Sequence, residues 1–476
     1  MLRPLKLGTS CGNARMLSSL IRRVLKPKSK SSADPSAAEK LSAHTKATTY
    51  GISKHGIDSA HVSKAALEVC SGLHSAGFEA YVVGGAVRDM LLAREPKDFD
   101  IATSATPEQV VRVFRRARII GRRFRIVHVM VGRELIEVTT FRAEKDGEDA
   151  KTDEHGRVLA DNTYGTLASD AARRDLTVNA MYYNPATQQV LDFHGGMADL
   201  SKHTLRMIGD PAARYREDPV RMLRIARFAA KLQFTIHPAS FKPIDALKGL
   251  VGNCPPSRLF DEVQKLLMSG YAVRTLDTLR ELKLSQGLLP VMDIVRAHPE
   301  GEAFVRLAMA STDERVNAGK STTPAFLFAT LLWYEVLGKA KQLVVQGESA
   351  FPARELAMTH VLEVQCDTLA IPRRYTTDMR DMWAMQLRFE QAARRSLSIL
   401  GHPRFRAGYD FFLLRCEAGE QPLHLGALWT QMHAADTREQ ATELLDAYIT
   451  EHAGSIEKPV AKKRRRRVAK PASAAE

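Results

Sequence analysis

The sequence predicts an α/β head followed by a mostly α-helical neck and body, with a disordered basic tail at each end. Strand and helix patterns alternate from about residue 60 to residue 141, and after about residue 200 apolar residues recur at helical spacing. The net charge of +15 lies in the tails: residues 1–33 hold eight Lys/Arg and no acid, residues 458–476 hold eight and one Glu, and the remainder is formally neutral. Such tails cannot bury enough apolar surface to fold.

The head is expected to alternate short helices and strands. The expected helices span 61–76, 86–93 and 107–117, and the expected strands span 79–83, 99–103, 125–131 and 134–141. Thr106 is a suitable cap and Pro107 suits the first helical position, so this pair predicts the start of the third helix. Gly132 separates two alternating runs that are typical of paired strands. We therefore predict a small mixed sheet.

The rest of the chain divides by composition. Segment 31–48 is small and polar, as linkers are, and the charged segment 143–163 is expected to be a mobile loop. Segments 218–234 and 324–338 carry helical spacing. The predicted boundaries are a tail and linker at 1–50, the head at 51–205, the neck at 206–285, the body at 286–450 and an Arg/Lys-rich tail at 451–476.

Composition narrows the class of protein. Hydrophobic residues make up 45% and charged residues 26% of the chain, and no apolar run has the length of a transmembrane segment. The five cysteines are scattered, odd in number and never in CxxC spacing, which argues against a disulfide framework and a zinc site.

The basic tails predict a polyanionic partner. RNA is the expected one, because phosphate neutralisation gives affinity independent of sequence. The alternatives are a solubilising tail or peripheral contact with an anionic membrane. Residues 1–33 are rich in Arg and Ser and free of acid, which also describes a mitochondrial transit peptide, so a mitochondrial location is the alternative to a bacterial cytoplasmic one.

Two aspartates stand one residue apart in KDFDIAT, residues 97–103. Side chains alternate along a strand, so Asp98 and Asp100 are expected to face the same way, with Phe99 and Ile101 on the other side. Two carboxylates that close repel unless a cation lies between them, and Mg²⁺ favours carboxylate oxygens together with substrate phosphates.

A glycine turn precedes this pair. VVGGAVRD, residues 82–89, is a predicted strand that runs into Gly84 and Gly85 and then into a helix. The glycines let backbone N–H groups approach a phosphate, the helix start adds partial positive charge, and Arg88 offers a bidentate contact. A phosphate-binding turn ahead of a metal-binding carboxylate pair predicts nucleotidyl transfer by two metals.

These motifs, with RRDLTVNAMYY (173–183) and YREDPVRMLRIARF (215–228), resemble the class II nucleotidyltransferases of the polymerase-β superfamily. This group contains the tRNA CCA-adding enzymes and the bacterial poly(A) polymerases. The resemblance covers about 75–290 and implies a polymerase-β-like head, Mg²⁺ (or Mn²⁺) as cofactor and ATP as substrate. It implies metal binding and catalysis by Asp98 and Asp100, and nucleotide binding by Gly84, Gly85, Arg88, Asp89, Arg174 and Asn179.

The third carboxylate has two candidates. Asp175 matches a family motif assigned to catalysis or ribose contact, and we prefer it. Glu137, on the neighbouring predicted strand, could complete the set by geometry instead. For either residue the alternative is a structural ion pair, since Arg173 and Arg174 are close in sequence.

EDPVRMLR is the candidate base-selection motif. Asp218, Arg221 and Arg224 are three residues apart, so they are expected to share one helix face, where an acceptor beside a donor fits the edge of adenine. Cytosine presents the same pair of groups, so the motif does not separate ATP from CTP. The alternative is that Asp218 caps the helix and the arginines form a solvated face. His128, in an apolar predicted strand, is expected to be a core or sheet-edge histidine.

Three further stretches favour the poly(A) polymerases within the group: residues 119–132, residues 402–415 and the Arg-rich tail. The resemblance implies template-independent addition of AMP to RNA 3′ ends, with an RNA-binding body and a product marked for decay, so that RNA-decay proteins are further expected partners. The alternatives are a CCA-adding enzyme and, from another class, a non-catalytic RNA-binding protein.

Overall fold

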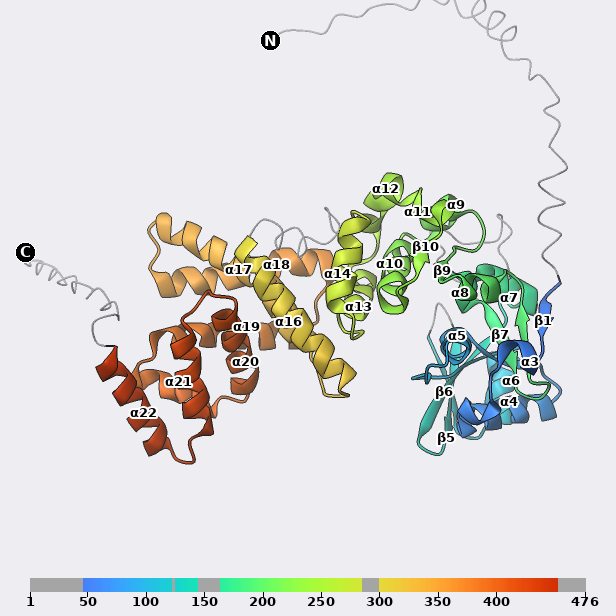
Figure 1. The fold of residues 1–476 in the computed structure, drawn as a ribbon, viewed down its shortest axis with the longest axis horizontal. Coiled ribbons are helices and arrows are strands. Elements are labelled where there is room, and N and C mark those ends of the chain that lie inside the picture. Colours follow the sequence, from blue (N-terminus) through green and yellow to red (C-terminus); the bar gives the residue numbers. More distant parts are fainter. Residues whose placement is uncertain (1–45, 122–124, 144–162, 285–298, 453–476) are drawn as a thin grey trace, which may run out of the picture. The chain divides into compact units, whose positions relative to one another are not determined.

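The computed structural model describes residues 46–121, 125–143, 163–284 and 299–452. The predicted basic tails, nearly all of the predicted linker at 31–48 and the predicted loop at 143–163 lie outside the described residues or at their edge. The order of elements runs from a strand-rich head to a long series of helices (Figure 1), as predicted.

The head is built on an eight-stranded mixed sheet with the order β1-β8-β7-β2-β3-β6-β5-β4. The strands are β1 (Thr48–Tyr50), β2 (Ala80–Val83), β3 (Asp100–Thr103), β4 (Ala117–Ile120), β5 (Ile126–Val131), β6 (Glu134–Thr140), β7 (Met181–Asn184) and β8 (Gln189–Asp192). Neighbouring strands are antiparallel, except that β3 and β6 run parallel. This parallel pair brings two distant segments of the chain together.

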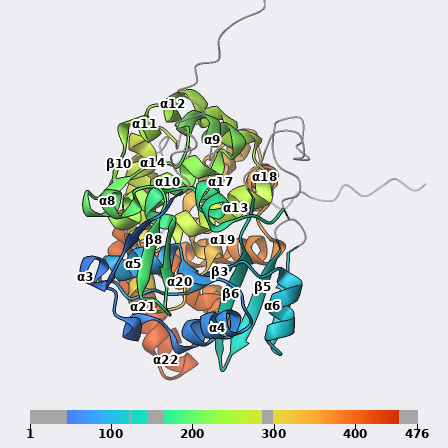
Figure 2. The same cartoon turned by 90° about the vertical axis from the view of Figure 1, so that its right-hand side faces the viewer.

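Helices α4 (Lys64–Ser75) and α6 (Pro107–Val113) pack against one face of the sheet (Figure 2). Aliphatic side chains of β3 and β6, such as Ile101 and Val138, meet Val69 and Leu73 of α4 there in a buried core. The other face carries a smaller buried cluster of Tyr81, Val83, Ala102, Phe141, Ala171 and Tyr182, to which α7 (Leu167–Arg173) contributes. Helices α3 (Ile52–His55), α5 (Gly85–Leu91) and α8 (Gly196–Ser201) complete the head with the short turns η1 (Ser59–His61) and η2 (Thr177–Asn179).

Three details differ from the sequence-based expectations. The sheet is larger than predicted, because β1, β4, β7 and β8 have only three or four residues each and give little periodic signal. The helix expected at 107–117 ends at Val113, where Phe114 is extended and the following segment pairs with β5. β3 begins at Asp100, so Asp98 precedes the strand and does not belong to it.

The neck includes a short parallel pair of strands, β9 (Thr204–Leu205) before its first helix and β10 (Thr235–Ile236) after its second. Its helices are α9 (Pro211–Glu217), α10 (Val220–Leu232), α11 (Pro238–Phe241), α12 (Ile244–Leu247), α13 (Pro256–Leu267) and α14 (Ala272–Glu281), with η3 (Lys248–Asn253) between α12 and α13. α10 packs against both α13 and α14, and its apolar side chains, Met222 and Ile225 among them, are buried.

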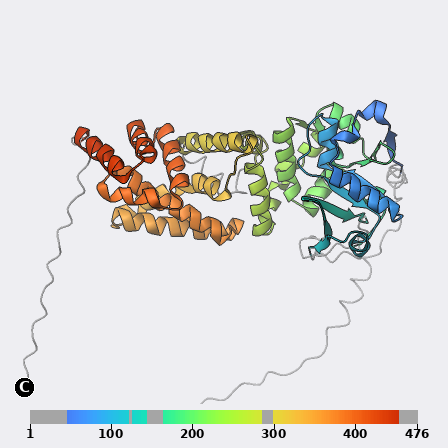
Figure 3. The same cartoon turned by 90° about the horizontal axis from the view of Figure 1, so that it is seen from below.

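The body is entirely helical in its described part (Figure 3). It comprises α16 (Pro299–Asn317), α17 (Pro324–Val345), α18 (Ala350–Leu369), α19 (Arg373–Gln391), η4 (Arg394–Gly401), α20 (Phe405–Glu417), α21 (Leu423–Ala434) and α22 (Arg438–Glu451). Trp333 of α17, Trp383 of α19 and Arg415 of α20 are buried together with their neighbours. No helix in the described ranges is both long and apolar enough to cross a membrane.

Candidate functional site

Two acidic residues face each other across the parallel strand pair. Asp100 opens β3 and stands in register with Glu137 of β6, and directly paired residues project from the same face of a sheet. Asp98 lies just before the strand. Loss of hydration, together with the charges of Asp98 and Glu137, raises the pKa of Asp100 to about 6, although Arg174 acts in the opposite direction. The three carboxylates therefore create a local excess of negative charge.

This charge excess suits a hard divalent cation, whose preferred ligands are carboxylate oxygens. A cation between Asp98 and Asp100 would offset both the loss of hydration and the repulsion between carboxylates that raise the pKa of Asp100. Across the described residues, no three His, Cys, Asp or Glu side chains are already arranged to enclose a metal ion. The donor set fits the ion by its chemistry, and part of its coordination is left for substrate oxygens or water.

The predicted glycine turn lies beside two guanidinium groups. Gly84 has φ of +72°, a conformation that side chains disfavour, and it precedes α5. A Cβ atom on Gly84 would lie 3.5 Å from Nη1 of Arg174, and one on Gly85 would lie 3.6 Å from Nη2 of Arg88. The turn thus places backbone next to two fixed positive charges, which is an arrangement that attracts phosphate.

Arg88 is held by a buried network. It is 2% exposed, donates to Oδ1 of Asp89 at 2.8 Å and to Oδ1 of Asn179 at 2.6 Å, and lies over the ring of Phe228 at 5.2 Å. Arg174 donates to the hydroxyl of Tyr182 at 2.9 Å. These contacts fix both guanidinium groups before any ligand arrives. The structure thus brings Arg88, Asp89, Arg174 and Asn179 together with the glycine turn.

Asp175 occupies a different environment from the one expected of a third metal-binding carboxylate. Its Oδ2 accepts two hydrogen bonds from Arg224, at 2.8 and 2.6 Å, and its Oδ1 accepts from the backbone of Leu176 and from Asn179. Burial alone would raise the pKa of Asp175, but the charge and hydrogen bonds of Arg224 outweigh it and hold that pKa at about 2. Both carboxylate oxygens of Asp175 already accept hydrogen bonds from the protein. Glu137, in contrast, is in register with Asp100.

Each of the three residues of the base-selection motif binds a different partner. Oδ2 of Asp218 accepts from Arg258 of α13 at 2.5 Å, Arg221 donates to Glu217 at 2.7 Å, and Arg224 binds Asp175. The expectation of one shared helix face is wrong for Asp218, which ends α9 before α10 begins. The capping alternative is wrong as well, since Pro219 occupies the cap of α10 without a side-chain hydrogen bond.

One acceptor in this motif is left over. Oδ1 of Asp218 is buried and has no hydrogen-bond partner among the residues that the structure describes. Leaving a charged acceptor unsatisfied in a buried position is costly, so an incoming donor group would be bound favourably there.

Sequence reasoning did not identify Arg258, Glu217 or Phe228 as parts of this site. Arg258 is separated from Asp218 by 40 positions, and no local pattern connects the two. Glu217 could have been noticed, because it immediately precedes Asp218 and is spaced i, i+4 from Arg221.

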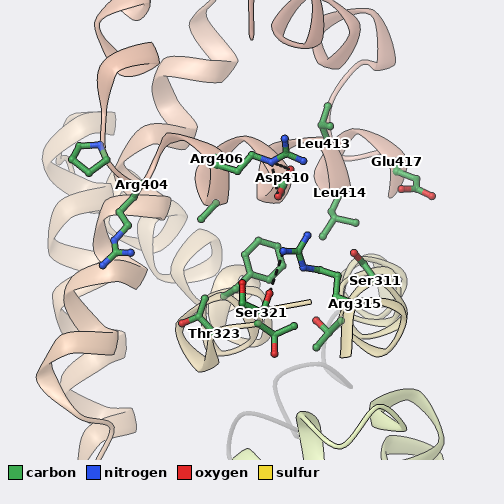
Figure 4. A pocket seen from close by; sticks show the side chains of 15 residues that line it. Ser311, Arg315, Ser321, Thr323, Arg404, Arg406, Asp410, Leu413, Leu414 and Glu417 are labelled. Atoms are coloured by element: carbon green, nitrogen blue, oxygen red, sulfur yellow. Dashed lines mark hydrogen bonds and ion pairs between the residues drawn. The ribbon is translucent and has the colours of Figure 1, made fainter. Parts of the chain in front are cut away.

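A cavity of about 600 Å³ lies in the body, between α16, the start of α17 and α20 (Figure 4). Its arginines are engaged within the protein: Arg315 donates to the carbonyl of Ser321, Arg404 pairs with Asp378, and Arg406 pairs with Asp410. None of the predicted site residues lines it. The carboxylates and the glycine turn of the head, not this cavity, form the candidate site.

Comparisons with known proteins agree with the chemistry of this site. A family model described as the poly(A) polymerase head domain matches residues 80–206, one described as a probable RNA- and SrmB-binding site of polymerase A matches 233–295, and one described as the arginine-rich C-terminus of polymerase A matches 346–470. The chain is 42% identical to poly(A) polymerase I of Salmonella typhi over 86% of its own length and 90% of the relative. The chain belongs to the poly(A) polymerase I family.

Other members of the poly(A) polymerase I family match at similar levels. The Escherichia coli O157:H7 protein is 44% identical over 81% of this chain and 85% of its own. The CCA-adding enzyme of Bacillus velezensis is more distant, at 33% identity over 61% of this chain and 72% of its own. Membership of the poly(A) polymerase I family confirms the prediction of a poly(A)-adding nucleotidyltransferase over both alternatives.

Solved structures of related architecture confirm the predicted fold class. A tRNA-processing enzyme in its apo form superposes with a TM-score of 0.52 at 19% identity, over 80% of this chain and 99% of that one. A tRNA nucleotidyltransferase solved with a primer tRNA and an ATP analogue gives 0.50 at 21% identity, over 76% and 98%. At these identities the likeness concerns the fold alone.

Proposed function

We propose that this protein extends RNA 3′ ends with AMP from ATP, without a template, at the carboxylates of the head. The observation that carries the proposal is the register of Asp100 with Glu137, with Asp98 beside them and a raised pKa at Asp100. Nucleotidyl transfer needs a cation-binding carboxylate set beside a site for triphosphate, and these residues with the glycine turn supply both.

We assign the metal ligands to Asp98 and Asp100, with Glu137 in place of Asp175 as the third carboxylate. Asp175 becomes a positioning residue, because Arg224 and Asn179 occupy its oxygens. Mg²⁺, with Mn²⁺ as an alternative, fits this oxygen donor set. Such a cation, when bound, supplies neutralisation of phosphate charge and acidification of an attacking hydroxyl.

The protein's own groups hold the triphosphate. Arg88 and Arg174 place fixed positive charge beside Gly84 and Gly85, where phosphate oxygens can reach backbone N–H groups. Asn179 joins Arg88 to Asp175, so the orientation of Arg88 depends on this buried chain of hydrogen bonds. The charge that develops on the leaving pyrophosphate is met by groups that need no rearrangement.

Base recognition is assigned to Asp218, whose buried Oδ1 would accept a hydrogen bond from the amino group of adenine. Arg221 of α10, which Glu217 holds through a hydrogen bond, is proposed as the matching donor. Cytosine offers matching groups, so kinetics with ATP and CTP in parallel test this assignment.

The body and the tails are proposed to hold RNA without sequence preference, because the excess positive charge lies in the tails. The added tail would mark RNA for decay, with RNA-decay proteins as partners and contact with anionic membrane as a further role of the tails. The bacterial relatives support a cytoplasmic location.

The deciding experiment extends a short unstructured RNA with each of the four nucleoside triphosphates supplied separately. A long ladder with ATP alone, lost in an Asp98→Ala/Asp100→Ala double variant, is expected. Addition that needs CTP and stops after completing the CCA end of a truncated tRNA would contradict the proposal. The double variant should retain the helical content of the wild type, which is the control for folding.

A further inference from the structure

The acidic pair belongs to a longer row of polar side chains across the sheet. Asp100 of β3 is in register with Glu137 of β6, Glu137 with His128 of β5, and His128 with Arg118 of β4. Directly paired residues of neighbouring strands project from the same face. All four side chains therefore emerge on one face, in a line that runs from the carboxylates to the edge strand.

Contacts within the row support this geometry. Nε2 of His128 lies 3.4 Å from Oε1 of Glu137, and the two side chains are 28% and 48% exposed. Arg118 is exposed and has no hydrogen-bond or ion-pair partner among the described residues. The row begins with negative charge and ends with an available positive charge.

The face that carries this row is not part of the core. Val127, Val129, Ile136 and Val138 point to the opposite face and are buried. On the near side, Leu135 is 44% exposed and pairs with the half-buried Met130. An exposed leucine beside a row of polar groups marks a surface suited to a ligand with both apolar and charged parts.

The charge of the surrounding segment indicates an anionic ligand. Arg118 on the edge strand and Arg116 just before that strand are both exposed, and the hydrogen bond of Arg116 goes to a neutral group, the carbonyl of Gly132. Single-stranded RNA has the required chemistry, because phosphates pair with arginine while bases and riboses pack on apolar side chains. The row extends from the carboxylates on β3 to the edge strand β4, three strands away. A surface of this length suits a chain of nucleotides better than a single free nucleotide.

We propose that the row Asp100–Glu137–His128–Arg118 is the surface that binds the last nucleotides of the RNA primer. Arg118 contacts a backbone phosphate, Leu135 packs against a base or ribose, and the 3′-hydroxyl lies at the carboxylate end. The inference rests on the proposed function, because it places the 3′ end of the RNA at those carboxylates.

The first test measures RNA binding without catalysis. A short 5′-labelled oligoadenylate is titrated with the full chain in EDTA over a series of salt concentrations, and its fluorescence anisotropy is read. Arg118→Ala should weaken binding about five- to tenfold and lower the slope of log affinity against log salt by about 0.7, the value for one phosphate contact on a single strand. Arg118→Lys should restore most of the slope, because it keeps the charge.

Arg112→Ala is the matched control. Arg112 is an exposed arginine on α6, the helix that packs against the opposite face of the same strands, so its removal changes net charge equally. It should leave affinity for the oligonucleotide close to that of the wild type. Equal binding by Arg118→Ala and Arg112→Ala would overturn the proposal.

Steady-state kinetics separate this inference from the proposed function. Arg118→Ala should raise KM for the short RNA and leave KM for ATP and kcat at saturating RNA unchanged. If the wild type added no AMP and Arg118→Ala still lost RNA affinity, the proposed function would fail and the proposed RNA-binding surface would stand. If the wild type made poly(A) and Arg118→Ala kept its KM for RNA, the proposed function would stand and the proposed RNA-binding surface would fail.

Discussion

Arg224 donates two hydrogen bonds, at 2.8 and 2.6 Å, to a single carboxylate oxygen of Asp175. Arg224 belongs to α10 of the neck, and Asp175 follows α7 of the head. Asp175 is almost buried and Arg224 is about one third exposed. The pair therefore joins the neck to the head, next to the hydrogen bonds through Asn179 that hold Arg88.

Removing one partner of this pair should destabilise the fold. Asp175→Ala is expected to lower the free energy of unfolding by about 3 kcal/mol, at the low end for buried pairs because Arg224 is partly hydrated. Urea unfolding followed by circular dichroism measures the change. Tryptophan fluorescence would report mainly on the body, because all three tryptophans lie there. Asp175→Ala/Arg224→Ala should cost less than the sum of the single variants.

The exposed pair of Arg394 and Asp446 provides the control. Arg394→Ala should leave the unfolding midpoint close to that of the wild type, because solvent screens such a pair. Additive effects at Asp175 and Arg224 would show that the two residues act independently.

The same pair predicts a dependence of stability on acid. The pKa of Asp175 is about 2 in the folded protein and near its ordinary value of 3.8 when unfolded. A depressed pKa stabilises the fold above the unfolded value, and this contribution disappears as pH falls from about 4 to about 2. The stability difference between the wild type and Asp175→Asn should therefore be largest near neutral pH and shrink across that window. A difference independent of pH would contradict this assignment.

The third carboxylate can be identified by comparing two conservative variants. Glu137→Gln should lower kcat for AMP addition by a factor on the order of 10²–10³, as expected when a group that stabilises the transition state is neutralised. Asp175→Asn, assayed well below its melting temperature, should keep kcat within about tenfold of the wild type, because it acts through Arg88 and not on the reacting atoms. The opposite ranking would restore Asp175 as the metal ligand.

Much of this site was accessible from local sequence. The glycine turn and the Asp98/Asp100 pair are short motifs whose residues act together because they are neighbours in the chain. The proposed preference for Glu137 over Asp175 was not accessible from local sequence, because it rests on the parallel pairing of β3 with β6 and on Arg224, a residue 49 positions from Asp175. The contact of Arg258 with Asp218 is equally long-range, and the shortest strands lack enough residues to show a period.

Base recognition by Asp218 gives a further prediction. Asp218→Ala should lower kcat/KM for ATP by about 10- to 100-fold, the loss expected for one hydrogen bond to a charged acceptor, with KM for RNA unchanged. Arg258→Ala should act in the same direction and less strongly, since it frees Asp218 without removing its acceptor. Kinetics with ATP and CTP in parallel provide the measurement. Unchanged kcat/KM in Asp218→Ala would assign base recognition elsewhere.

The parallel pairing of β3 with β6 sets what the head can tolerate during evolution. The segment between the two strands forms α6, β4 and β5, and its length can change in loops without moving Asp100 relative to Glu137. A deletion of a single residue inside β6 is different, because side chains alternate along a strand and the shift exchanges Glu137 for Val138 or Ile136 opposite Asp100. Natural length variation should therefore collect in the connections of this segment and spare the two strands.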